Sequence, residues 1–210
     1  MRTIETVLYK FSELSDEAKQ TAIQEYRGEG VDTSCYFDEA HESIKKFHDV
    51  VGTESGHRSW LDVRTGHIED DILELSGVRL RTYLINNFEE LFYERKYINS
   101  FHRDERPNTH PMRTIEKHLR GGYWVRNLSN FKTESCCPLT GVCYDEDLLQ
   151  PFKEFIKAPD NRSFEDLINE AFSTLSNSLD NEEEHLNSDE AITEAIESNE
   201  YEFNEDGTQF

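Results

Sequence analysis

The sequence predicts an α+β fold, in which a mostly helical single domain packs on a small, partly antiparallel sheet and ends in an acidic helical region. Three observations support this fold class. Hydrophobic residues make up 35% of the 210 residues and aromatic residues 11%, which is enough for a packed core despite a net charge of -22. Apolar residues recur at helical spacing along most of the chain. A few short stretches alternate apolar and polar residues as strands do.

The N-terminal part is predicted to be a strand that leads into two helices. Residues 5–11, ETVLYKF, alternate as a strand does. Ser15 is followed by two acidic residues and then by apolar residues at helical spacing, which indicates a helix N-terminus. A second amphipathic pattern runs from Phe37 to Val51, and Gly52 is expected to end that helix.

The middle of the chain mixes strands, helices and one long loop. RSWLDVR, at 58–64, and GGYWVRNL, at 121–128, are predicted strands, and residues 80–92 are a predicted third helix. Residues 99–113 contain two prolines, few apolar residues and several charges, so we expect an exposed loop there.

Three further helices are expected at about 145–157, 163–180 and 188–200, and Asp206-Gly207 predicts a turn near the last residue. Ser163 and Asp166 fit a capping box at the start of the second of these helices. The whole of 1–210 is expected to form one domain, with 163–210 as its acidic helical part.

Acidic charge is concentrated at the C-terminal end. Residues 163–210 contain 15 Asp and Glu and no Lys or Arg, whereas residues 95–126 contain 8 basic and 3 acidic residues. An even distribution would place about 5 basic residues in the last 48, so their absence calls for an explanation.

The last predicted helix separates its apolar and acidic residues by face. Ala191, Ile192, Ala195 and Ile196 lie on one side, and Glu190, Glu194 and Glu197 lie opposite. Eight acidic residues form the predicted partner-binding surface: Glu182, Glu183, Glu184, Asp189, Glu190, Glu194, Glu197 and Glu200. The helix from Ser15 begins with the same Ser-Asp-Glu-Ala, but it contains Lys19 and Arg27, which are expected to relieve its acidic residues.

Three interpretations of this surface remain open. It is a solvated face that increases solubility, or an imitation of the phosphate charges of duplex DNA, or a surface that folds against the basic stretch of this chain or of a second copy in a homodimer. Direct nucleic-acid binding by the basic stretch is not expected, because the rest of the chain would repel a polynucleotide.

Catalytic and metal-binding motifs are weak, and no catalytic residue, metal or cofactor is predicted. Cys136, Cys137 and Cys143 lack the paired spacing of zinc sites and are read as reduced thiols, although His118 or His185 could join them around a metal. Two acidic clusters could serve a divalent-metal enzyme, but helix-start and surface-loop roles fit them better: Asp145, Glu146 and Asp147, and His67, Glu69, Asp70, Asp71 and Glu74.

Three stretches resemble a widespread set of uncharacterised tailed-phage and prophage proteins, some of them labelled antitoxins: LYKFSELSDEAKQTAIQEYR, CPLTGVCYDEDLLQP and YEFNEDGTQF. The resemblance implies a viral accessory protein and no specific chemistry. No apolar run is long enough to cross a bilayer, and the N-terminal residues lack the apolar stretch of a signal peptide, so we expect the bacterial cytoplasm and no membrane contact.

The functional expectation is an acidic, phage-encoded inhibitor of a basic, DNA-binding host protein, such as a defence nuclease. The alternatives are an antitoxin-like protein-binding module and a divalent-metal-dependent enzyme.

Overall fold

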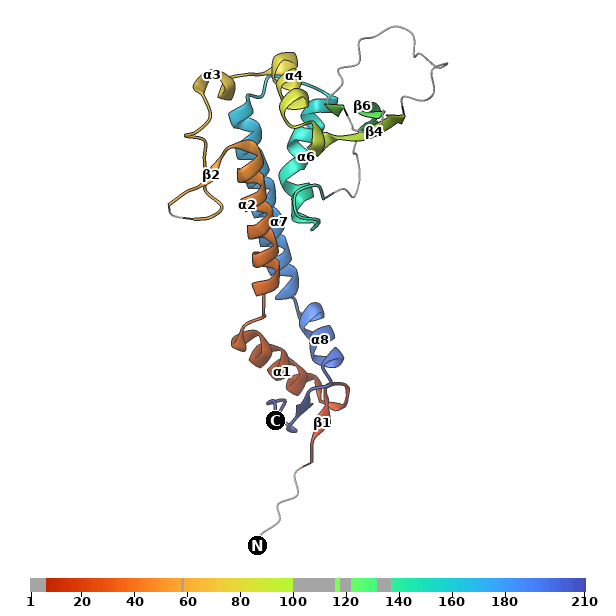
Figure 1. Ribbon diagram of the computed structural model, residues 1–210. Coiled ribbons are helices and arrows are strands. Elements are labelled where there is room, and N and C mark those ends of the chain that lie inside the picture. Colours follow the sequence, from red (N-terminus) through yellow and green to blue (C-terminus); the bar gives the residue numbers. More distant parts are fainter. Residues whose placement is uncertain (1–6, 58, 100–115, 118–121, 132–136) are drawn as a thin grey trace. The chain divides into compact units, whose positions relative to one another are not determined.

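The computed structural model describes residues 7–57, 59–99, 116–117, 122–131 and 137–210, and for those between 94 and 131 it describes the strands alone. Helices predominate and the strands pair antiparallel, which confirms the predicted α+β class (Figure 1). The chain divides into two compact units. Unit 1 comprises Met1–Phe37 and Asn177–Phe210, and unit 2 comprises Asp38–Ser176. That the whole chain folds cooperatively as one domain stays a prediction.

Unit 1 brings together segments from both ends of the sequence. Its elements are β1 (Tyr9–Lys10), the 3-10 helix η1 (Phe11–Glu13), α1 (Asp16–Glu29), α8 (Asp189–Ser198) and β7 (Glu202–Phe203), with the first residues of α2 (Ser34–Val51) and the last turns of α7 (Phe164–Leu186). Figure 1 shows α1 beside α8. β1 pairs antiparallel with β7, so that Tyr9 lies opposite Phe203. Of the strand predicted at 5–11, Tyr9 and Lys10 are paired and Phe11 already begins the 3-10 helix, while residues 5–6 lie outside the described part of the chain.

The core of unit 1 forms between the apolar faces of α1 and α8. Its buried residues are Phe11, Leu14, Ala18, Ala22, Ile23, Ile192, Ile196 and Phe203. The rings of Phe11 and Phe203 meet edge to face, with centroids 6.2 Å apart. The helical periodicity of both segments thus identified the buried faces correctly.

Unit 2 has a core rich in phenylalanine. Its helical elements are the rest of α2 and α7, α3 (Asp70–Leu73), α4 (Gly77–Asn87), α5 (Glu89–Phe92) and α6 (Tyr144–Lys157). The ring of Phe47 in α2 contacts those of Phe152 and Phe172, with centroids 5.9 and 5.7 Å away. The helix predicted at 80–92 is divided at Phe88, whose backbone leaves the helical region at φ -121° and ψ 34°.

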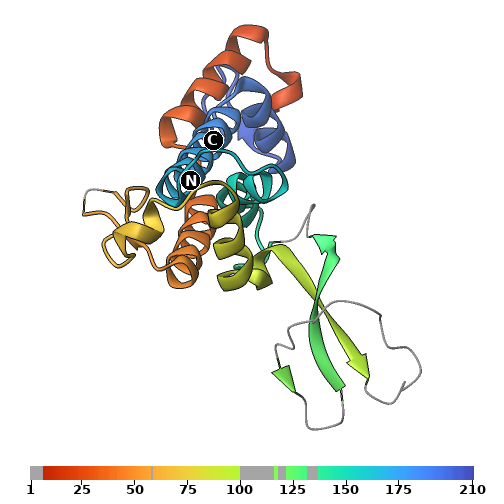
Figure 2. The same ribbon diagram turned by 90° about the horizontal axis from the view of Figure 1, so that it is seen from above.

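Two antiparallel sheets belong to unit 2. β2 (Glu54–Ser55) pairs with β3 (Val63–Arg64). Of the strand predicted at 58–64, the last two residues are thus paired in a strand and residues 59–62 are not, while residue 58 lies outside the described residues. β4 (Tyr93–Asn99), β6 (Gly122–Phe131) and β5 (Glu116–Lys117) lie in the order β4-β6-β5 (Figure 2). The strand predicted in GGYWVRNL is confirmed. Of the loop predicted at 99–113, Asn99 ends β4 and the other residues lie outside the described part of the chain.

The C-terminal helices begin as the sequence indicates. In α7, Ser163 N–H donates to Asp166 Oδ2 at 2.8 Å and Asp166 N–H donates to Ser163 Oγ at 3.0 Å, which completes the predicted capping box. In the part of the chain that the structure describes, none of the helices combines the length and apolar character needed to span a membrane.

Candidate interaction surface

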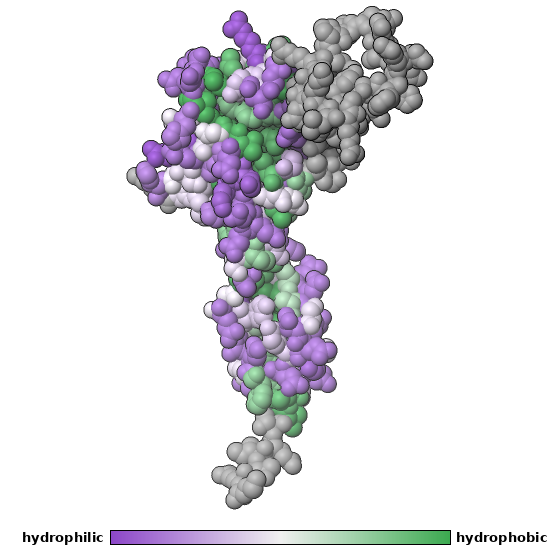
Figure 3. All heavy atoms as spheres, in the orientation of Figure 1, coloured by the Kyte–Doolittle hydropathy of each residue, from purple (hydrophilic) through white to green (hydrophobic). Residues whose placement is uncertain are grey.

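Unit 1 carries most of the net negative charge of the protein. It contains 19 acidic and 4 basic residues, a net charge of -15, whereas unit 2 contains 25 and 18, a net charge of -7. The visible face of α1 and α8 in Figure 3 is largely hydrophilic. Unit 1 would therefore attract a positively charged molecule more strongly than unit 2 would.

The acidic ridge of α8, which we define as Glu190, Glu194 and Glu197, faces away from the core. Ser188 caps the helix, since its Oγ accepts from Ala191 N–H at 3.2 Å. Ile192 and Ile196 are each only 1% exposed, and the three glutamates of the ridge are exposed. The predicted separation of apolar and acidic faces is confirmed.

α1 offers an internal comparison for the ridge, because it has the same start and packs on the same core. Its cap, Ser15, accepts from Ala18 N–H at 3.2 Å, as Ser188 does in α8. Counted from these caps, the positions of the ridge in α1 are occupied by Glu17, Thr21 and Gln24, and all three are exposed. At these three exposed positions α1 thus has one acidic residue, whereas α8 has three.

The basic residues of α1 do not act as the sequence suggested. Arg27 does not relieve its own helix, because its guanidinium reaches α8 and donates to Asp189 Oδ1 at 2.5 Å and to the Asn187 carbonyl at 3.1 Å. Lys19 lies over the ring of Phe11, with Nζ 6.0 Å from the centroid. Asp189 therefore has a counter-charge within unit 1, which sequence patterns did not indicate because the two residues are so far apart in the chain.

Glu200 lies beyond α8 in a left-handed backbone conformation, at φ 54°. Glu200 N–H donates to the Glu197 carbonyl at 3.1 Å and Tyr201 N–H donates to the Ile196 carbonyl at 3.4 Å, a Schellman arrangement that normally has glycine at this position. The Glu200 carbonyl accepts from Lys10 Nζ at 2.8 Å, and Lys10 also lies 3.5 Å from Glu202. Glu200 thus joins the helix end to β1.

Glu182, Glu183 and Glu184 occupy the last turns of α7, where Glu182 is half-buried and the other two are exposed. Among residues 7–57, 59–93 and 137–210, no ion pair involves these three carboxylates or the ridge. The predicted surface is therefore divided. Asp189 has a counter-charge in Arg27, and Glu200 contacts Lys10 through its backbone carbonyl. The seven carboxylates other than that of Asp189 have no ion pair in these ranges.

The alternative acidic cluster at 145–147 has structural contacts. Asp145 is buried, and its Oδ2 accepts from the N–H groups of Leu139, Thr140 and Gly141 at 2.9, 2.8 and 3.1 Å, while Oδ1 accepts from Thr140 Oγ1 at 2.9 Å. This carboxylate therefore holds the loop before α6 in place. The neighbouring Glu146 forms an ion pair with the buried Lys153.

The other metal candidates are dispersed in the described structure. His67 Nε2 lies 3.3 Å from Glu54, whereas Asp70 and Asp71 form the first turn of α3. Cys143 is exposed, Cys137 is half-buried, and Cys136 and His118 lie outside the described residues. Within the described ranges, no group of three His, Cys, Asp or Glu residues is arranged to hold a metal ion.

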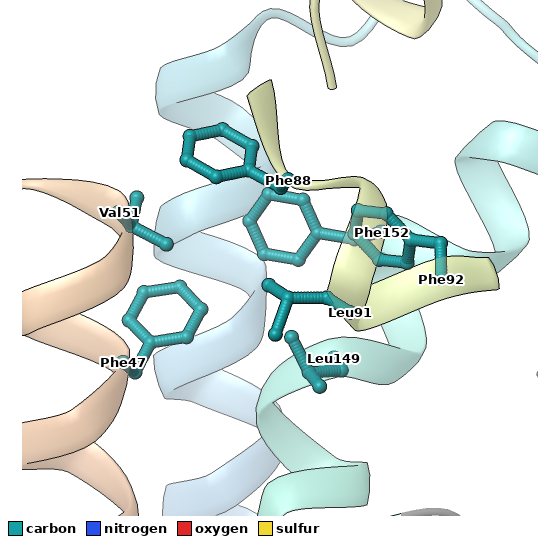
Figure 4. Close-up of a pocket in the computed structure, with 7 residues that line it drawn as sticks. All are labelled: Phe47, Val51, Phe88, Leu91, Phe92, Leu149 and Phe152. Carbon is teal, nitrogen blue, oxygen red and sulfur yellow. The ribbon is translucent and has the colours of Figure 1, made fainter. Parts of the chain in front are cut away.

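An apolar pocket of unit 2 is part of the packed core. Side chains from α2, α5 and α6 and from Phe88 converge on it (Figure 4): Phe47, Val51, Phe88, Leu91, Phe92, Leu149 and Phe152. It has no space for a water molecule, because these side chains pack closely against one another. They thus stabilise the packing of the helices.

A histidine of unit 2 has an environment that the sequence did not predict. His48 Nδ1 lies 2.7 Å from Thr53 Oγ1 and Nε2 lies 3.1 Å from Ser55 Oγ, while the ring stacks on Phe172 with centroids 5.5 Å apart. Burial lowers the pKa of His48 from its usual 6.5. These contacts connect the end of α2 to β2, because Thr53 and Ser55 flank the first residue of that strand.

Comparisons with known proteins give no match: no family model, no curated protein and no solved structure corresponds to this chain. The resemblance to phage and prophage proteins thus stays an expectation from the three quoted stretches.

Proposed function

We propose that the chain is an acidic, phage-type protein that binds a basic, DNA-binding host protein, such as a defence nuclease, and occupies its DNA groove with the ridge and the end of α7. The observation that carries this proposal is the contrast between α8 and α1. Both helices have the same cap and the same core, yet at equivalent exposed positions α8 has three glutamates and α1 has one.

Folding alone would not favour this concentration of charge. Glu190 and Glu194 are four residues apart and Glu194 and Glu197 three, so each pair repels at a cost of roughly 0.2–0.5 kcal/mol. The α1 residues Thr21 and Gln24 show that uncharged polar side chains are compatible with these positions. A binding role explains why the repulsion is tolerated.

The spacing of the ridge supports an imitation of DNA over a short distance. At about 1.5 Å of rise per residue, its carboxylates follow one another at about 6 and 4.5 Å along the helix axis. Phosphates of one DNA strand follow at about 3.4 Å, so the ridge has roughly two thirds of that linear charge density. The ten residues of α8 span about 15 Å, which corresponds to about four base pairs. The carboxylates at the end of α7 add charge beyond that length.

The test compares binding by two variants with equal net charge. Wild-type protein is used to capture partners from host lysate, and each captured protein is purified. It is then titrated with wild type and with two triple variants. The ridge variant combines Glu190→Gln, Glu194→Gln and Glu197→Gln, and the control variant in unit 2 combines Glu39→Gln, Asp49→Asn and Glu74→Gln. The three control residues are exposed. We expect at least a tenfold loss of affinity for the ridge variant alone, weaker binding at higher salt, and competition by duplex DNA.

Equal affinities of the two variants, or binding that duplex DNA does not displace, would contradict the proposal. A partner that binds the ridge but has no affinity for DNA would instead favour the antitoxin-like alternative.

A further inference from the structure

Unit 1 has a shallow groove between the start of α2 and the end of α7. Seven residues line it: Thr33, Tyr36, Phe37, Leu179, Glu182, Glu183 and Leu186. The first three lie before or at the start of α2, and the other four recur at helical spacing along α7. All belong to unit 1.

The surface of the groove is almost wholly apolar, and two glutamates are among the residues that line it. Leu179 is buried, and Tyr36, Phe37 and Leu186 are half-buried. Glu182 is also half-buried, although no ion pair within the described ranges neutralises it. A carboxylate that lies next to apolar side chains is stabilised when a cation or a hydrogen-bond donor approaches it.

The lysines and the arginine of unit 1 that the structure describes already have other contacts. Among residues 7–37 and 177–210, Lys10 contacts Glu200 and Glu202, Arg27 contacts Asp189, and Lys19 lies over Phe11. The net charge of unit 1 is -15, so a cation for the groove is best supplied by a basic partner.

We infer that this groove binds an arginine side chain of the basic partner, an inference that rests on the proposed function and names an anchor for it. The depth of the groove favours arginine over lysine, because the groove has room for only about one water molecule and cannot enclose a side chain. A planar guanidinium can instead lie flat on the aromatic side chains. Its N–H groups then donate to Glu182 and Glu183, for which a forked donor is better suited than the point charge of an ammonium group.

The test uses two helical peptides of lysine and alanine that differ at one central position, which is arginine in the first and lysine in the second. Their net charge is the same, so electrostatic attraction to unit 1 is equal. We expect the arginine peptide to bind the full-length protein about five- to tenfold more tightly, since stacking and forked hydrogen bonds are available to it alone.

Variants locate the preference and separate it from the proposed function. Glu182→Gln and Tyr36→Leu should each abolish the preference for arginine, and circular dichroism verifies that both variants are folded. The ridge variant should bind both peptides more weakly but retain the preference.

Equal binding of the two peptides by wild type, or a preference that survives both groove variants, would overturn the groove assignment and leave the ridge proposal intact. Loss of the preference in the ridge variant alone would also overturn it, because the arginine would then bind at the ridge.

Discussion

Among the glycines at 28–77, 141 and 207, Gly207 is the one at which the structure predicts the largest effect of adding a methyl group. It lies in the turn after β7, where its N–H donates to the Asn204 carbonyl at 3.0 Å and its φ is +89°. A Cβ built there would be 2.0 Å from the Ala18 carbonyl oxygen and 2.7 Å from the Ala18 carbonyl carbon, both in the backbone of α1. The turn thus packs so closely on α1 that only glycine fits.

The expected cost of Gly207→Ala has two parts. A side chain at this φ costs about 1–2 kcal/mol. Relief of the clash requires the turn and α1 to separate by at least about 1 Å, and such overpacking costs about 1–3 kcal/mol. The free energy of unfolding should therefore fall by about 3 kcal/mol. Because the obstacle is backbone, no side-chain rotation can relieve it.

Gly30→Ala is the matched control in the same unit. Gly30 has a φ of +88°, and a Cβ there would meet no atom within 4 Å, so it should lose only the conformational part. Urea unfolding followed by circular dichroism measures both variants. A loss at Gly207 no larger than that at Gly30 would refute the close packing of the turn on α1.

Three further predictions concern other positions. Glu200→Gly should raise the free energy of unfolding by about 0.5–1 kcal/mol, because glycine adopts the left-handed conformation at φ 54° without strain. A lower stability of this variant in thermal unfolding would show that Glu200 is not strained. Asp145→Ala should lower the free energy of unfolding by about 3 kcal/mol and Asp145→Asn by less, since alanine leaves the part-buried N–H donors of residues 139–141 without their acceptor. Urea unfolding tests the order of the two. The pKa of His48 should lie below 6.5 in an NMR titration, because burial disfavours its charged form. The folded state then binds the proton more weakly than the unfolded state, so stability should fall as the pH decreases from above 6.5 through the lowered pKa. His48→Gln should remove this pH dependence. A His48 pKa at or above 6.5 would contradict the burial of its ring.

Local sequence signals predicted the parts of the fold that depend on neighbouring residues. Ser15, Ser163 and Ser188 marked three helix starts because a cap bonds only to the first turn. The apolar and acidic faces of α8 followed from the 3.6-residue period of its side chains, which also depends only on neighbouring residues. The cap and the period together were sufficient to locate the ridge.

Long-range contacts could not be predicted in this way. Nothing near Tyr9 indicates its pairing with Phe203, and the apolar pattern through Phe88 continues although the helix does not. The groove of unit 1 was likewise missed, since Tyr36 and Leu179 become neighbours only when α2 and α7 meet. The partners of Asp145 and Asp189 could not be predicted from sequence, because they depend on the folded loop before α6 and on Arg27.

The joining of α1 to α8 has a consequence for synthesis on the ribosome. Arg27 and its acceptor Asn187 are separated by 160 residues, so translation at about 5–20 residues per second leaves α1 without its partner for roughly 8–30 s. During that interval the side chains of Ala22 and Ile23 remain exposed and can bind chaperones or form non-native contacts. The acidic surface of unit 1 is thus assembled late, after unit 2 has left the ribosome, and a nascent chain that stops before α8 never presents it.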